Sequence, residues 1–509
     1  MKITNIIILA IGFMSAQIVD AATWRFDPRI SVSETYTDNV FLSESNESDD
    51  FITDITPGIR ITGTGRYLQL DFDYQYQSLI YADDSSLNDE FTQLRGTMTS
   101  ELIEGHLFLE ADANIGQANI STLGRTSSNN LNVTGNRTDT STYRISPIYR
   151  HSLAGLIDAE LQYTYAKVNV DAGAGDSESD QYSVRLNNGR KFNRFRWSID
   201  YQNSQSDRSN LTNNTTNSKT RFESYEGNVT FPITRKFSGI VEAGKENNNF
   251  NSSRDRRDGD FVSAGVGYQP SRRLLLEIVG GDRDRFTLNW QPSQRTDLQF
   301  TFRSQNFGAN SGDTVNARFE HRTRRSNWQL SYIDETTTTQ DVLLNDRASV
   351  LLDNNGDPVL DPLTNDPIII TPDGLNLRDD VFNRRRLNAS VTYNTGKSTI
   401  RAQLFTEMRD SEEVGSSEKG VGTNLTWTWQ LASRTESIVS ANWRRDESDN
   451  QNESDQFDFG INLIRRVSPR TIANLNLRHV DRDTDNGNTN NLFSGYEENT
   501  ISAGIRATF

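Results

Sequence analysis

The four histidines would matter most if this chain were an enzyme, because a hydrolase would need one of them as a general base. His106, His151 and His321 lie beside short turns of the sequence, and His479 lies near the carboxyl terminus. None of them stands in the Ser/His or Asp/His pattern that nucleophilic catalysis requires. The chain also contains no cysteine, which removes thiolate zinc sites and cysteine nucleophiles. We therefore expect no enzymatic activity.

One segment resembles a calcium-binding loop. Asp353, Asn355 and Asp357 fit the first, third and fifth positions of the EF-hand pattern. The sixth position should be Gly and the last should be Glu, but this chain has Pro358 and Thr364 there. The sharp turn and the bidentate ligand are both missing, so a tight surface turn explains the segment better. We expect no metal ion and no cofactor.

The composition excludes further classes of protein. The 509 residues carry a formal net charge of −16, which argues against a nucleic-acid binder because phosphate groups need a basic face. Apolar residues make up only 34% of the chain, and the mean hydropathy is −0.68. So long a chain with so little apolar sequence is either disordered or has a wet interior.

Strict alternation of apolar and polar residues decides between these two classes. It runs through residues 68–77, 107–115, 157–165, 194–202 and 399–404. A period of two places all the apolar side chains of a strand on one face and all the polar ones on the other. A disordered chain has no reason to keep this phase. We predict that the polar faces line a lumen, with these positions among its lining: Asp71, Asp73, Glu160, Arg194, Arg196, Asp200 and Arg401.

Two kinds of connection separate the alternating runs. Eleven short turns, such as the one at 188–190, are rich in the Gly, Asn and Pro that tight hairpins need. Between them lie longer polar loops, including 116–139, 445–456 and a much longer one at 339–380. This order predicts an antiparallel transmembrane β-barrel of about 24 strands, with short periplasmic turns and long extracellular loops. The weak hairpin signal at 280–282 keeps 22 strands as an alternative.

A soluble β-sandwich would also alternate, but it would have to bury its apolar faces against each other. Four tryptophans lie near the short turns, where an interfacial girdle of a membrane barrel would place amphipathic rings. They are Trp290, Trp328, Trp427 and Trp429. This placement favours the membrane barrel.

The two ends of the chain predict export and membrane insertion. Lys2, an apolar run at 6–16 and small residues before position 22 form a signal peptide over 1–21, followed by one barrel domain over 22–509. Alternation begins near Ile30, so we expect no N-terminal plug and no TonB-dependent receptor. The last strand alternates up to an aromatic residue, like the terminal signal that the outer-membrane insertion machinery recognises: Ile501, Ala503, Ile505, Ala507 and Phe509.

Several short polar motifs carry a resemblance to a known family. They include Ser-Glu-Thr-Tyr-Thr-Asp-Asn-Val at 33–40, Ile-Thr-Pro-Gly-Ile at 55–59, Trp-Gln-Pro-Ser-Gln-Arg-Thr at 290–296 and His-Arg-Thr-Arg-Arg-Ser at 321–326. In order and spacing they resemble the outer-membrane barrel family associated with PEP-CTERM/exosortase loci, and the resemblance covers most of the mature chain. The resemblance implies an envelope role linked to exopolysaccharide. It supplies no catalytic residues to carry over.

Charge placement completes the functional expectation. Basic residues mark the short turns and acidic runs fall in the long loops, so the periplasmic rim could attract an anionic polymer. We expect a non-enzymatic outer-membrane barrel for exopolysaccharide export or surface display, with loop 339–380 as an inward-folding constriction of a hydrophilic pore. The alternatives are a general or solute-specific porin and a closed structural or adhesive surface barrel. The expected partners are outer-membrane lipid, the insertion machinery, and exopolysaccharide or its export components.

Overall fold

The computed structural model describes most of the chain. The described residues are 22–172, 175–192, 194–208, 218–250, 258–345, 377–378, 380–413, 415–449, 452–485 and 495–509. The predicted signal peptide over 1–21 and the segment that resembles a calcium-binding loop lie outside them, as does most of loop 339–380.

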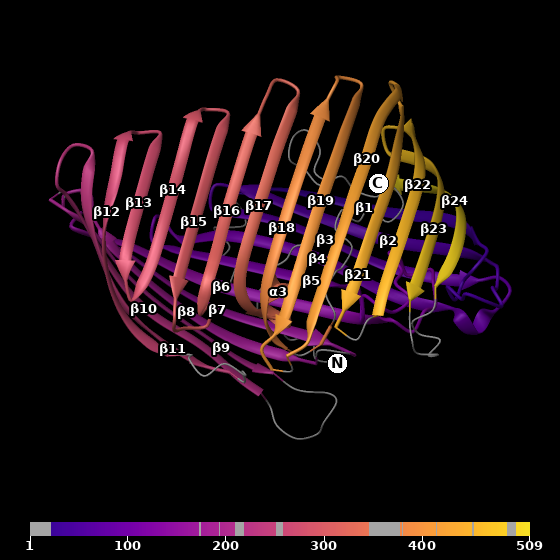
Figure 1. The fold of residues 1–509 in the computed structure, drawn as a ribbon. Helices are drawn as coiled ribbons and strands as arrows, with labels where there is room; N and C mark the ends of the chain where they lie inside the picture. Colours follow the sequence, from indigo (N-terminus) through magenta and orange to yellow (C-terminus); the bar gives the residue numbers. More distant parts are fainter. Residues whose placement is uncertain are drawn as a thin grey trace.

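The strands form one closed sheet, because each strand pairs with the next along the chain and β24 pairs back onto β1 (Figure 1). All pairings in this ring are antiparallel, which confirms the predicted fold class. The elements are β1 (Ala22–Thr37), β2 (Asp50–Gly65), β3 (Leu68–Tyr81), the 3₁₀ helix η1 (Ser85–Leu87), β4 (Asp89–Ile103), β5 (Leu107–Asn119), β6 (Arg137–Leu153), β7 (Ile157–Val170), β8 (Ser177–Asn188), β9 (Arg196–Arg208), β10 (Ser218–Pro232), β11 (Phe237–Asn249), β12 (Gly259–Ser271), β13 (Leu274–Gly281), β14 (Arg283–Ser293), β15 (Thr296–Gln305), β16 (Gly312–Arg322), β17 (Ser326–Thr338), the helix α3 (Thr339–Asn345), β18 (Val381–Asn394), β19 (Ser398–Ser411), β20 (Ser417–Ala432), β21 (Thr435–Ser448), β22 (Asn452–Ser468), β23 (Thr471–Asp485) and β24 (Tyr496–Thr508).

The strand count settles on 24 because β13 and β14 are separate strands joined only by Asp282. The backbone N–H of Val262 on β12 donates to Asp282 Oδ2 at 2.9 Å, so the turn is tied to the neighbouring strand. A Cβ at Gly281 would lie 2.4 Å from the carbonyl oxygen of Val262, so only glycine fits there.

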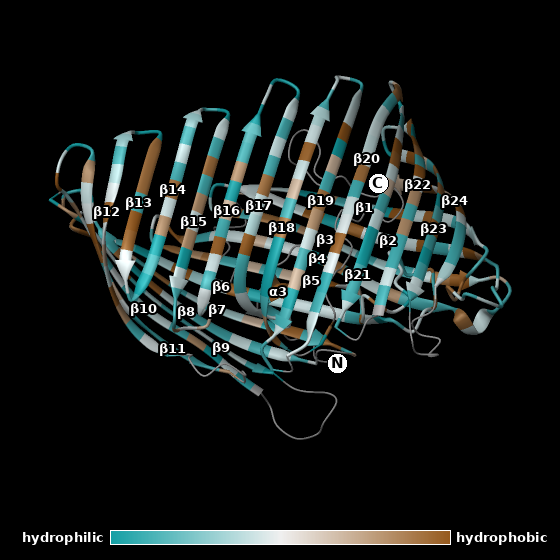
Figure 2. Cartoon of the chain, viewed as in Figure 1, coloured by the Kyte–Doolittle hydropathy of each residue, from teal (hydrophilic) through white to brown (hydrophobic). Residues whose placement is uncertain are grey.

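The apolar residues face outward. On β24, Ile501 and Ile505 are more than half exposed, and the alternate residues Glu498, Thr500 and Ser502 are buried. Figure 2 shows the resulting bands of apolar and polar residues along the strands. An apolar outer face and a polar inner face are the arrangement of a barrel that stands in lipid. Trp290, Trp328, Trp427 and Trp429 are all exposed near the short turns.

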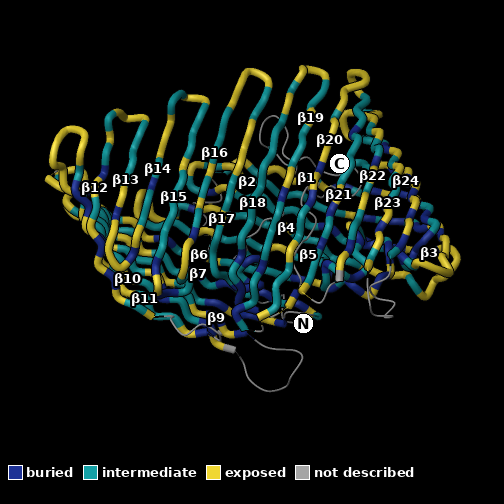
Figure 3. The backbone as a smooth tube through the Cα atoms, in the orientation of Figure 1, coloured by how far each residue is buried: buried dark blue, intermediate teal, exposed yellow. Residues whose placement is uncertain are grey.

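The barrel therefore has two different ends. We call them the short-turn end, which lies at the top of Figure 1 for the hairpins from β14 to β21, and the long-loop end, which lies below. Buried residues gather toward the long-loop end (Figure 3). Three small apolar clusters lie there on the inner side of the wall, around Val342, Ile52 and Tyr496. Among the described residues, no helix is long and apolar enough to cross a bilayer.

Several strands run further than the alternation predicted. The expected loop at 445–456 shrinks to 449–451, and the loop at 116–139 shrinks to 120–136. A crossing of the bilayer needs only ~9–11 residues, whereas β22 has 17. Beyond the apolar belt, toward the long-loop end, the strands continue with polar residues on both faces. Cross-strand ion pairs such as Lys419–Glu447 and Arg445–Asp455 hold them together there.

Candidate functional site

The inner wall of the barrel is built from ion pairs between neighbouring strands. Arg60 on β2 contacts Asp71 on β3 with two hydrogen bonds, of 3.0 and 2.6 Å. One strand further back, Arg29 of β1 donates to Asp73 of β3 at 3.0 Å. Such forked guanidinium–carboxylate contacts have a fixed geometry, and each charge is neutralised by its partner. Asp71 and Asp73, both predicted to line the lumen, thus lie on the inner side of the wall in ion pairs.

A second run of inner-wall charges crosses β6 to β9. Arg150 donates to Glu160 at 2.7 Å, and Arg185 lies between Glu160 and Asp200, at 3.9 and 2.9 Å. Arg196 begins β9 and shares its face with Asp200.

The other two predicted lumen positions have different surroundings. Arg194 lies in the exposed connection between β8 and β9, because β9 begins two residues later than the alternation indicated. Arg401 on β19 is part-buried, and its Nε donates to Thr392 Oγ1 at 3.2 Å.

The lysines of the described strands all lie on the outer face. Lys167, Lys219, Lys245 and Lys419 are in phase with the exposed apolar residues of their own strands, so they face outward. Each of them pairs with a carboxylate on a neighbouring strand. The inward-facing cations of the described strands are therefore arginines, whose planar guanidinium makes two parallel contacts where an ammonium makes one. The lumen wall is therefore arginine-rich and largely self-neutralised.

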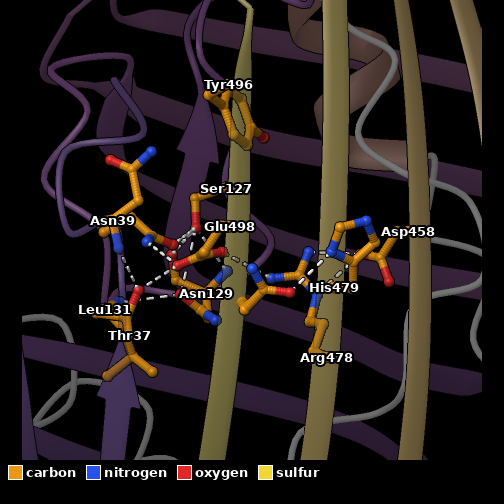
Figure 4. A network of polar contacts seen from close by, with 12 residues as sticks. Thr37, Asn39, Ser127, Asn129, Leu131, Asp458, Arg478, His479, Tyr496 and Glu498 are labelled. Carbon is orange, nitrogen blue, oxygen red and sulfur yellow. Dashed lines mark hydrogen bonds and ion pairs between the residues drawn. The ribbon is translucent and has the colours of Figure 1, made fainter. Parts of the chain in front are cut away.

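One loop folds into the lumen. Residues 120–136, here called the inward loop, connect β5 to β6 but contact the inner faces of β3, β22, β23 and β24. Asn130 donates to Gln77 of β3 at 2.8 Å, and Asn132 donates to Glu498 of β24 at 2.6 Å. Glu498 also accepts from Thr37 of β1 at 2.9 Å and lies 3.7 Å from Arg478 (Figure 4).

The inward loop reaches as far as β22, which is seven positions from β5 in the ring. Thr126 donates to Gln456 of β22 at 2.8 Å, and its carbonyl oxygen accepts from Tyr496 at 2.6 Å. Arg482 of β23 donates to the carbonyl oxygen of Thr122 at 2.9 Å. Because β5 and β22 are seven positions apart in the ring, the inward loop crosses part of the lumen and narrows it at the long-loop end.

Helix α3 makes a second crossing. Thr338 caps its start, accepting from the N–H of Asp341 at 3.0 Å. Val342 of α3 packs on Val168 and Val170 of β7, although the helix follows directly on β17. β7 and β17 are ten positions apart in the ring. The first residues of the predicted constriction at 339–380 therefore do fold inward, and the described part of it joins opposite walls.

A buried ion pair reinforces this crossing. Arg208 at the end of β9 is fully buried and lies 2.9 Å from Glu413, in the connection after β19. Together with α3, this contact brings the wall at β7–β9 against the wall at β17–β19. We call this contact region the pinch. Two carboxyl groups in the pinch, those of Asp341 and Asp380, lie outside the strands, and burial raises the pKa of each. The pKa of Asp380 rises to about 6.

The four histidines lie at three separate places on the barrel wall. His106 and His151 stand 5.3 Å apart between ring centroids near the short turns, in a stack with Tyr149. His321 Nδ1 lies 2.9 Å from Thr296 Oγ1, and His479 Nδ1 lies 2.9 Å from Asn499 Oδ1. Within the described ranges, no three His, Cys, Asp or Glu side chains are grouped to hold a metal ion.

The residues of the predicted insertion signal share one face. Ile501, Ala503, Ile505 and Ala507 all lie on the outer face of β24, which pairs with β1. The N–H of Phe509 donates to the carbonyl oxygen of Pro28 at 2.9 Å, and its ring is exposed.

A closed antiparallel barrel with an apolar outer belt and a polar inner wall is an outer-membrane β-barrel. No protein-family model and no curated protein matches the sequence. Several solved barrels are similar to it at low identity. The siderophore receptor PirA from Pseudomonas aeruginosa is 10% identical, over 96% of this chain and 81% of its own, with a TM-score of 0.41.

Two further structures give similar figures. The FrpB iron transporter from Neisseria meningitidis is 9% identical, over 97% of this chain and 83% of its own, with a TM-score of 0.45. OccK1 (OpdK) from Pseudomonas aeruginosa is 8% identical, over 95% of this chain and 99% of its own, with a TM-score of 0.37. These likenesses concern the barrel architecture only.

Sequence reasoning missed the inward loop. Residues 120–136 were expected to be an ordinary surface loop, because their partners on β22, β23 and β24 lie more than 300 positions away in the sequence. The density of Asn, Ser and Thr in this segment is the one signal that could have indicated a loop with many hydrogen-bond partners.

Proposed function

We propose that this chain is a non-enzymatic outer-membrane conduit for exopolysaccharide, which passes through the lumen from the periplasmic to the outer face. The observation that carries the proposal is the inner wall, where charges are paired between neighbouring strands, as in Arg60–Asp71 and Arg185–Asp200. A polymer of hydroxylated sugars needs groups that replace its hydrogen bonds to water. It also needs a wall that does not hold it, since passage requires binding weak enough to be released.

The crossings at the long-loop end fit a conduit that is narrowed where the polymer would leave. The inward loop is held mainly by hydrogen bonds of side chains, such as Asn132 to Glu498. These bonds are separate from the ladder bonds between strands, and water can replace them when the loop moves, so the constriction can move without disturbing the strands. The resemblance to barrels of exopolysaccharide loci supports the choice of polymer, and the periplasmic assignment of the short turns follows the usual design of these barrels.

Two other functions are tested by the same experiment. A porin for small solutes would use the same polar wall. A closed surface barrel, whose long loops hold matrix material, is favoured by the pinch, where Arg208 and Glu413 join opposite walls.

Planar-bilayer recording of the purified barrel separates the three functions. A conduit shows discrete open steps that the exopolysaccharide of the producing cell blocks from one side. A porin shows open steps that the polymer leaves unchanged, and a closed barrel shows no steps. Either of the last two results overturns the proposal.

A further inference from the structure

The short-turn end contains a polar cavity of about 300 Å³ on the inner wall of β14, β15 and β16. We call it the mouth cavity. This volume lies at the lower end of the range of small-molecule sites, which is ~300–1,000 Å³. Arg318, Glu320 and Arg322 line it from β16 and alternate with Phe319, which is in register with outward-facing Leu330. The cavity therefore opens toward the lumen.

Two guanidinium groups in the mouth cavity are not neutralised. Arg295, in the turn before β15, and Arg322, at the end of β16, are adjacent because the N–H of Arg322 donates to the carbonyl oxygen of Arg295 at 2.8 Å. Neither side chain makes an ion pair or hydrogen bond to the described residues. This sets them apart from Arg60, Arg144 and the other paired arginines of the wall.

The rest of the lining suits hydroxyl groups. Glu320 is held by Arg318 at 2.5 Å, and Asp297 accepts from Gln299 at 3.1 Å, so each keeps carboxylate lone pairs for further donors. The amides of Gln291 and Gln294 both donate and accept. The two carboxylates would repel a small inorganic anion. A sugar acid suits both the guanidinium groups and the carboxylates of the lining. Its own carboxylate would face the free guanidinium groups, and its hydroxyls would face the carboxylates of Asp297 and Glu320.

We propose that the mouth cavity binds a carboxylate-bearing sugar unit and is the point at which an acidic polysaccharide enters the barrel. This inference rests on the proposed function and names its substrate class. Sugar recognition by paired hydrogen bonds fits the lining, and the position at the short-turn end places the contact where a polymer from the periplasm first meets the wall.

Calorimetry on the purified barrel in detergent tests the proposal, with trigalacturonate as the probe. Its fully methyl-esterified form serves as the neutral match, and inorganic phosphate serves as the simple anion. The site variant is Arg295→Gln/Arg322→Gln. The matched control is Arg434→Gln/Arg466→Gln, because the N–H of Arg466 donates to the carbonyl oxygen of Arg434 at 2.9 Å in the same arrangement outside the cavity.

We expect trigalacturonate to bind the wild type and the control alike, and the site variant about tenfold or more weakly, as loss of two charged contacts implies. The methyl ester and phosphate should bind the wild type no more tightly than they bind the site variant. Equal binding to wild type and site variant overturns the proposal, as does equal loss in the control, which would indicate diffuse attraction by the rim. Phosphate binding as tight as that of the sugar also overturns it.

Bilayer recordings distinguish failure of the mouth-cavity proposal from failure of the proposed function. If the wild type shows no open steps, the conduit is wrong whatever the cavity binds. If acidic polymer blocks the open steps of the wild type and of the Arg295→Gln/Arg322→Gln variant equally, the conduit stands and the mouth cavity is wrong as its entrance.

Discussion

The two ends of the barrel differ in where their contacts lie. At the long-loop end, contacts cross the lumen: Asn132 reaches Glu498, Val342 reaches β7, and Arg208 reaches Glu413. At the short-turn end, contacts stay between neighbours, and aromatic rings such as Trp427 and Trp429 stack on the outer face. The hydrogen-bonded ring of strands closes without the crossing contacts. The crossing contacts therefore set the width of the lumen, whereas the pairing of the strands closes the barrel.

The largest effect is expected from Glu498→Ala. Thr37 and Asn132 lose their acceptor, and Arg478 keeps only Asp458. Breaking such a buried charged network costs about 3 kcal/mol in the free energy of unfolding. Guanidinium unfolding in micelles measures the loss, and bilayer recordings should show longer open times because the inward loop is released.

The control for this variant is Glu497→Ala. Glu497 is the adjacent residue on the outward face and lies 3.9 Å from His479. It should leave unfolding and conductance unchanged. If both variants lose the same stability, the inward loop is not held by Glu498.

A smaller effect is expected from Val342→Ala. The change removes apolar contact with Val168 and Val170, at about 1–2 kcal/mol for the packing of α3 on β7. The packing of α3 is separate from the strands, so proteolysis of the long loop should speed up while unfolding of the barrel changes little. Unchanged proteolysis would mean that α3 does not hold the loop in place.

Acidification should tighten the pinch. Burial raises the pKa of Asp380 from its ordinary value of 3.8 to about 6, with Glu413 adding to the rise and the hydrogen bond from Ser411 opposing it. The folded pinch thus binds an extra proton between these two values, and its stability falls as pH rises through that window. Open steps should be more frequent at neutral pH than at a pH near 5.

The variant Asp380→Asn should weaken this pH dependence, since the amide does not titrate and Asp341 is then the one carboxyl group described in the pinch with a raised pKa. The control is Asp84→Asn, because Asp84 lies in an exposed turn where hydrogen bonds from Ser86 lower its pKa. A pH response as large in Asp380→Asn as in the wild type would contradict the assignment.

The smallest effect is expected at the short-turn end from Trp427→Ala. Trp427 and Trp429 stack on the outer face with centroids 5.4 Å apart. Such an aromatic pair contributes about 0.5–1.5 kcal/mol, so unfolding should shift slightly and conductance should not change. A change in conductance would contradict the view that only the contacts at the long-loop end control the width of the lumen.

The strand number could be predicted from the sequence because it follows from local patterns. Alternation and turn residues act over a few positions, and so the hairpins around Gly105 and Gly396, both with positive φ, could be located. The strand ends could not, because above the membrane the strands are held by ion pairs such as Arg445–Asp455 and not by an apolar face. The partner of Asn132 could not be predicted either, since Glu498 lies 366 residues away.

The most direct test of the account is the single-channel conductance of a variant in which residues 122–134 of the inward loop are replaced by a short Gly-Ser link. Because the ring of strands does not depend on this loop, the variant should fold as the wild type does and show larger open steps. A folded variant whose open steps equal those of the wild type, or that shows none, would contradict the claim that this loop narrows a water-filled lumen.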